Sequence, residues 1–169
     1  MASTDGSGEL VFLTYSLPRD PSAPRLALWR KLRRLGVAQL SDGLVALPAD
    51  ARTREQLEWA ADEVIAAGGT AGVWLARAST RAQERDVARG MNIARAEEYR
   101  TLTEAAIDAL TLPDADRMRA LRRLRAENTR IRRRDFFRPA EREQARQALN
   151  ALAATLRTTS PPSELEVRS

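Results

Sequence analysis

The sequence predicts an α+β fold, in which a ferredoxin-like β-α-β-β-α-β sandwich is followed by a C-terminal annex of three helices. Between residues 9 and 78, short apolar runs and amphipathic segments alternate in that order. From residue 79 onward, apolar residues recur only at helical spacing and arginine becomes frequent. We therefore expect a ferredoxin-like domain over 9–78, a helical extension over 79–157, and flexible tails at 1–8 and 158–169.

The first strand and helix are predicted from one apolar run and the turn residues after it. The run ELVFLTYS, residues 9–16, is typical of a buried strand. Leu26, Trp29 and Leu32 recur at helical spacing, and Gly36 is well placed to end that helix in the left-handed conformation. We expect Trp29 and the other two tryptophans to serve packing rather than stacking on a ligand, with Trp59 partly exposed because it lies off the main apolar stripe of its helix.

A hairpin, a second helix and a last strand complete this half of the chain. Asp42-Gly43 lies between two apolar runs, as in a tight hairpin turn. Thr53 and Gln56 have the spacing of a capping box, which predicts the start of a helix. Apolar residues within 57–65 give that helix an inward face, and the run AGVWLARA at 71–78 predicts the last strand.

Helical spacing and breakers predict three further helices. Thr80 and Gln83 offer a cap for the first, and Pro113 separates it from the second. Phe136-Phe137 is expected to fill the corner between the second and third helices. The positions expected to face inward are Met118, Leu121, Leu124 and Ile131 in the second helix, and Ala145, Leu149, Leu152 and Leu156 in the third.

Composition excludes several classes of function. The chain of 169 residues has no cysteine and no histidine, which removes thiolate nucleophiles, Cys/His zinc sites and Ser-His-Asp triads. We expect no enzyme, no catalytic residue, no metal site and no cofactor. No apolar run approaches the ~18 residues of a membrane span, so we expect a cytoplasmic protein with no membrane partner.

The basic residues are unevenly distributed. The chain carries 28 Lys+Arg against 23 Asp+Glu, and Lys31 is the single lysine. Residues 117–138 hold ten arginines against Glu127 and Asp135, a net charge of +8. Arginine forks suit phosphate geometry, which favours nucleic acid as the partner. The DNA-binding candidates are Arg119, Arg122, Arg123, Arg125, Arg130, Arg132, Arg133 and Arg134. A solvated face with a structural or oligomeric role explains the same charge run equally well.

A second basic block covers residues 19–34, with six basic side chains against Asp20. Arg19, Arg25 and Arg30 lie near the predicted start of the first helix, where backbone N–H groups favour anions. They are the candidates for an oxyanion site. Solubility is the alternative explanation for this block.

Several short segments carry a family resemblance. They are Tyr15-Ser16-Leu17-Pro18, Leu28-Trp29-Arg30-Lys31-Leu32, Leu47-Pro48, Ala67-Gly68-Gly69, Ala96-Glu97-Glu98-Tyr99 and Asp135-Phe136-Phe137. With these segments the chain resembles the N-terminal domain of the chromate-resistance regulatory protein ChrB over most of 9–156, and more distantly the sheet domain of PaaX-type repressors. The resemblance implies a chromate-responsive transcriptional regulator that accompanies a chromate efflux transporter.

The first functional hypothesis is therefore a non-catalytic, homo-oligomeric regulator that binds DNA through the arginine-rich helix, with chromate or another oxyanion as its effector. The resemblance implies a further C-terminal domain, which members of that family usually carry, and we expect this chain to lack it. A second hypothesis is therefore a truncated partner-binding or dimerisation module without DNA binding. A third is a sensor in which Arg19, Arg25 and Arg30 hold chromate or sulfate. Without cysteine or histidine, we do not expect the chain to reduce chromate itself.

Overall fold

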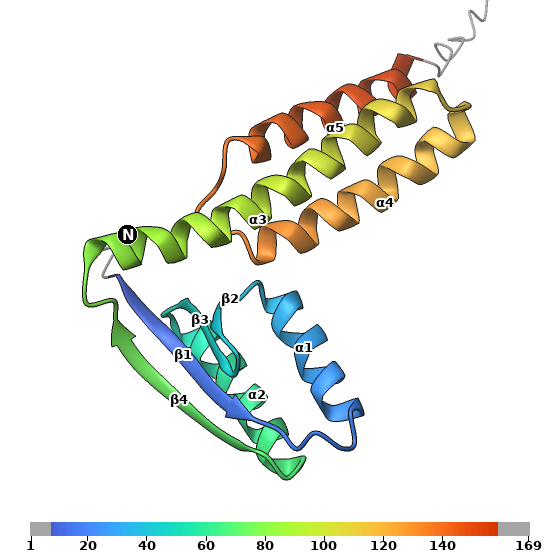
Figure 1. The fold of residues 1–169 in the computed structure, drawn as a ribbon. Coiled ribbons are helices and arrows are strands. Elements are labelled where there is room, and N and C mark those ends of the chain that lie inside the picture. The colour runs from blue at the N-terminus through green and yellow to red at the C-terminus, as the bar shows by residue number, and fades with distance from the viewer. Residues whose placement is uncertain (1–7, 159–169) are drawn as a thin grey trace, which may run out of the picture. The chain divides into compact units, whose positions relative to one another are not determined.

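The protein is described by a computed structural model over residues 8–158. A four-stranded antiparallel sheet and five α-helices confirm the α+β class (Figure 1). The chain packs as two compact units, the first ending at Asn92 and the second beginning at Ile93. The domain boundary predicted after residue 78 stays a prediction. Most of the predicted tails lies outside the described residues.

The first unit contains the sheet and two helices. Its elements are β1 (Glu9–Ser16), α1 (Ala23–Leu35), β2 (Ala38–Ser41), β3 (Leu44–Pro48), α2 (Ala51–Ala66) and β4 (Thr70–Arg77). The strand order is β2-β3-β1-β4. In the β1–β3 register, Val11 pairs with Leu47 and Leu13 with Val45, and all four side chains are fully buried. Leu57 and Val64 of α2 belong to the same buried set, so the helix and the sheet close one apolar core.

Two glycines confirm the predicted turns. Gly43 in the β2–β3 hairpin has a φ of 73°, and a Cβ there would lie 2.3 Å from the carbonyl oxygen of Tyr15. A side chain is therefore excluded both by the backbone conformation and by the neighbouring strand. Gly36 ends α1 with a φ of 75°, and its N–H donates to the carbonyls of Leu32 and Arg33.

The three tryptophans are exposed, which corrects the packing prediction for Trp29 and Trp74 and agrees with the expected exposure of Trp59. Trp29, Trp59 and Trp74 are each more than half exposed. On α1 the buried positions are Leu28 and Leu32, and Trp29 is turned by about 100° from Leu28. Its ring instead lies under the Arg33 guanidinium, 4.8 Å from the ring centroid, in a cation–π contact.

The capping box of α2 lies three residues before the predicted one. Asp50 is the N-cap, and its carboxylate accepts from the Thr53 N–H at 2.7 Å. The Thr53 hydroxyl accepts from the Asp50 N–H at 2.9 Å. Thr53 is thus the third helical residue rather than the cap, because the extended backbone at Asp50 already presents a carboxylate to the first turn.

The second unit is built from helices that run side by side (Figure 1). Its elements are α3 (Arg81–Asp108), which begins in the first unit, the 3₁₀ turn η1 (Ala109–Thr111), α4 (Asp114–Arg133) and α5 (Glu141–Thr158). The inward positions predicted on α4 and α5 are buried or partly buried except Met118. Ala120 takes the inward place, and Met118 is exposed with its sulfur 3.3 Å from Arg122 Nη2. Phe136 is half-buried, whereas Phe137 is exposed and does not fill the corner.

A buried carboxylate joins the three segments of this unit. The Asp135 side chain is 0% exposed. Its Oδ2 accepts from the Tyr99 hydroxyl of α3 at 2.9 Å and lies 3.3 Å from Arg142 Nη1 of α5. Its Oδ1 accepts from the Arg138 backbone N–H at 2.8 Å. Burial raises the pKa of the Tyr99 hydroxyl, and the bond to Asp135 raises it further, so the phenol stays protonated as a donor.

A second polar contact ties α3 to the end of α4. Glu98 lies 2.9 Å from Arg134 Nη2 and 3.3 Å from Arg95 Nε. Burial lowers the pKa of the Arg95 guanidinium, and the charge of Glu98 opposes that change. One carboxylate therefore compensates two largely buried guanidinium groups, and without it both would be left buried and uncompensated.

Replacing Tyr99 tests the contribution of the Asp135 contacts. Tyr99→Phe removes one donor and leaves Asp135 with a lone pair unsatisfied in a buried site, so the free energy of unfolding should fall by about 1–3 kcal/mol. Urea unfolding followed by circular dichroism measures this change. Tyr15→Phe is the matched control, because the structure records no hydrogen bond of that hydroxyl. Equal small effects in both variants would show that the bond to Asp135 does not stabilise the fold.

The same bond predicts a loss of stability at alkaline pH. The unfolded chain releases the Tyr99 proton near its ordinary pKa of about 10, whereas the folded chain holds it to higher pH. Stability should therefore be fully present below pH ~10 and fall above it by up to about 1.4 kcal/mol per pH unit from this group. Unfolding curves measured between pH 9 and pH 11 should show a shallower decline for Tyr99→Phe than for Tyr15→Phe. Parallel declines would contradict the assignment.

Candidate functional site

Basic surfaces are the functional candidates that remain in the described part of the chain. Between residues 8 and 158, no helix combines the length and apolarity needed to cross a membrane. Within the same range, no three carboxylates gather as metal ligands. The arginine-rich helix α4 carries the residues that the sequence predicts to bind DNA.

The arginines predicted to bind DNA lie mostly on the outer face of α4. Its buried stripe is Ala120, Leu121, Leu124 and Ile131, which turns the arginines between those positions outward. Those exposed are Arg119, Arg122, Arg123, Arg125, Arg130, Arg132 and Arg133. Arg134 differs, because its side chain is 16% exposed and bound to Glu98.

Carboxylates on α4 neutralise only a part of this face. Arg119 pairs with Asp116, and Arg130 pairs with Glu127 at 2.8 Å, both at helical i,i+3 spacing. Such exposed pairs are weak and yield readily to a competing anion. Arg123 and Arg125 make no ion pair with a described residue. We call the exposed arginines at 119–133 the α4 arginine face.

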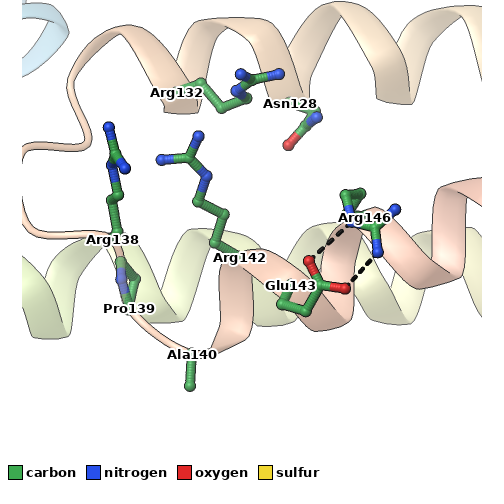
Figure 2. Close-up of a pocket in the computed structure, with 8 residues that line it drawn as sticks. All are labelled: Asn128, Arg132, Arg138, Pro139, Ala140, Arg142, Glu143 and Arg146. Atoms are coloured by element: carbon green, nitrogen blue, oxygen red, sulfur yellow. Dashed lines mark hydrogen bonds and ion pairs between the residues drawn. The ribbon is translucent and has the colours of Figure 1, made fainter.

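A basic pocket opens beside this face, between α4 and α5 (Figure 2). It encloses about 360 Å³. Asn128 and Arg132 line it from α4, and Figure 2 shows the Arg138 and Arg142 side chains reaching toward them from the α4–α5 link and from α5. The complete lining is Asn128, Arg132, Arg138, Pro139, Ala140, Arg142, Glu143 and Arg146.

The charges of this pocket are only partly compensated. Arg146 binds Glu143 through two bonds of 2.8 and 2.5 Å, and this contact lowers the pKa of Glu143 to about 2. Arg142 is held by the buried Asp135. Arg132 and Arg138 make no ion pair with a described residue. Four guanidinium groups thus face two carboxylates, which leaves a net charge of +2.

The Asp135 contacts also shape the pocket wall. Arg138 has a φ of 52°, a left-handed conformation that costs a residue with a side chain roughly 1–2 kcal/mol. The 2.8 Å bond from its N–H to Asp135 Oδ1 holds this conformation. The buried carboxylate therefore fixes both the link that carries Arg138 and the side chain of Arg142.

The sequence analysis missed this pocket. Arg138, Arg142 and Arg146 are spaced four residues apart, which places the last two on one face of α5. That spacing was the available signal. The spacing alone does not show that Asn128 and Arg132 of α4 line the same pocket, because that depends on how α4 packs on α5.

The three predicted oxyanion residues of the first unit make different contacts. Arg25 donates to the backbone carbonyls of Leu17 and Pro18 at 3.3 and 3.5 Å. Arg19 lies on the link between β1 and α1, and Arg30 lies on α1. Both are exposed, and neither makes an ion pair with a described residue. An oxyanion site formed by these three stays a prediction.

Comparison with known proteins identifies the family. The family model described as "Protein ChrB, N-terminal" matches residues 25–160, which include α2 to α5 and all but the first two residues of α1. No curated protein matches the chain significantly. The matched range takes in Ala96-Glu97-Glu98-Tyr99 and Asp135-Phe136-Phe137, the two segments that the Tyr99–Asp135 bond brings together. The chain belongs to the ChrB N-terminal family, which relates it to chromate resistance.

Proposed function

We propose that this chain is a non-catalytic, DNA-binding regulatory protein of the chromate response, and that it contacts DNA through the α4 arginine face. The family relates the chain to chromate resistance. The observation that supports DNA binding is the exposure of seven arginines on one helix of 20 residues. Such a helix is ~30 Å long, enough to follow several phosphates of a duplex.

Physical chemistry favours phosphate as the partner of this face. Guanidinium forks donate two parallel hydrogen bonds to an anionic group, and arginine is more weakly hydrated than lysine. Binding releases counterions from the duplex, so affinity should fall steeply with salt. Phosphate contacts position a protein without reading sequence, so any preference for one operator would come from other side chains.

We also propose a ferredoxin-like topology for the sheet unit, followed by the annex of α3, α4 and α5. The antiparallel order β2-β3-β1-β4 supports it, with α1 after β1 and α2 after β3. In this arrangement the sheet unit serves as a scaffold, and the basic chemistry belongs to the helices after it. We further propose a cytoplasmic protein that acts as a homo-oligomer.

A partner-binding or dimerisation module is the second candidate. Exposed apolar side chains around η1 favour it. They are Ile107, Leu110, Leu112 and Met118, from the end of α3 to the first turns of α4. Apolar side chains gathered in one region of a surface are typical of protein contacts. This candidate predicts a stable oligomer with no affinity for DNA.

Substitution of the α4 arginine face tests the first candidate. The triple variant Arg122→Ala, Arg123→Ala and Arg125→Ala removes three exposed guanidinium groups outside the pocket. Fluorescence anisotropy should follow binding to a labelled duplex from upstream of the protein's own gene at roughly 50 and 200 mM salt. We expect affinity to fall at least about tenfold, and the slope of log K against log[salt] to fall by up to about 2.7.

The control variant removes the same charge elsewhere. Arg54→Ala, Arg89→Ala and Arg157→Ala take one exposed arginine each from α2, α3 and α5. A loss as large as that of the α4 variant would mean that only overall charge matters. A scrambled duplex measures sequence preference in the same assay. Absence of binding to either duplex at low salt would refute the proposal and leave the partner-binding candidate.

A further inference from the structure

The basic pocket between α4 and α5 has the properties of an anion site that shares only Arg132 with the α4 arginine face. Its lining comes from three different segments, namely α4, the α4–α5 link and α5 (Figure 2). Arg132, Arg138 and Arg142 therefore approach one volume from different sides. A flat helix face would present its side chains in parallel, and it would suit an extended backbone rather than a compact ligand.

One guanidinium group is fixed before any ligand arrives, and a second is in an exposed ion pair. Arg142 has a side chain 28% exposed and is held by the fully buried Asp135. Arg146 is held by both oxygens of Glu143. Donors that are already oriented lose less conformational freedom on binding, which favours affinity.

The other two groups supply the uncompensated charge. Arg132 and Arg138 have no carboxylate partner among the described residues. They repel each other and the other two arginines, and the repulsion is relieved when an anion enters. A dianion balances the net charge of +2 that the four arginines, Glu143 and Asp135 leave.

The geometry selects the shape of the anion. Arginine forks bind oxygens in pairs, and donors that converge from three segments match an anion with oxygens directed to several sides. Asn128 adds an amide to the same lining. The volume of about 360 Å³ is far larger than the ~30 Å³ share of one water, so the anion has room to keep part of its hydration.

We propose that this pocket binds a small tetrahedral oxyanion dianion, with Arg132 and Arg138 as the main charge partners and Arg142 as a fixed donor. Sulfate, hydrogen phosphate and chromate are its chemical representatives. The site does not depend on DNA binding, although Arg132 also belongs to the α4 arginine face. A phosphodiester of the duplex offers related oxygens, so the test separates a free anion from DNA.

Direct titration without DNA tests the site. Sodium sulfate, phosphate and chromate are added separately to the full chain at constant ionic strength, with sodium chloride as the filler. Binding is read by isothermal titration calorimetry and by the rise in melting temperature, since a ligand of the native state stabilises it. We expect saturable binding and a rise for at least one of the three oxyanions, and no rise when the dianion is replaced by chloride.

Variants show whether the binding belongs to this pocket. Arg132→Ala with Arg138→Ala should weaken binding at least tenfold. Arg123→Ala with Arg125→Ala removes the same charge from α4 outside the pocket and should change affinity less than twofold. Because Arg138 lies at a φ of 52°, Arg132→Ala alone is a second variant that leaves the link untouched, and it should weaken binding at least threefold.

Three outcomes would overturn the proposal. The first is the absence of saturable binding by all three oxyanions. The second is an equal loss in the pocket variant and the Arg123/Arg125 control, which would mean non-specific attraction. The third is loss of duplex binding in the pocket variant without any binding of free oxyanion, which would make the pocket part of a DNA contact. The proposed function is tested separately, because its triple variant shares no residue with the pocket.

Discussion

The second unit depends on one buried carboxylate. Asp135 receives a phenol from α3, a backbone N–H from the α4–α5 link and a guanidinium from α5. A carboxylate without solvent is costly unless its lone pairs are occupied, and these three donors occupy most of its roughly four acceptor sites. Once Asp135 is satisfied in this way, the course of the link and the start of α5 are determined. The wall of the basic pocket follows from that course.

The arginines of the second unit divide into two groups with different physical roles. Arg95, Arg134 and Arg142 have largely buried side chains and face carboxylates, so their charge is used within the fold. On the outer α4 surface, Arg119 and Arg130 are in exposed ion pairs, whereas Arg123 and Arg125 make no ion pair with a described residue. Net charge alone does not separate these groups, because residues 117–138 contain members of both. Some arginines of this segment therefore stabilise the fold, and others give its surface a positive charge.

Turn residues and apolar spacing predicted most helices and strands, but they did not predict the contacts between one helix and another. Gly36 and Gly43 were identified because a positive φ leaves few alternatives to glycine. The inward positions Leu121 and Leu124 followed from helical spacing. Trp29 was misplaced because spacing fixes the angle between positions but not which of them face the core. The pocket was missed for a related reason, since Arg132 and Arg142 meet only through the packing of α4 on α5.

Arg132 belongs both to the α4 arginine face and to the basic pocket, and this sharing has an energetic consequence. An anion in the pocket would compensate a positive charge that a duplex would otherwise meet. Binding of one anion must then weaken binding of the other by the same factor, because the coupling free energy is reciprocal. Arg122, Arg123 and Arg125 lie outside the pocket, so most of the face would keep its charge. Such a coupling would act on one part of the α4 arginine face rather than on the whole.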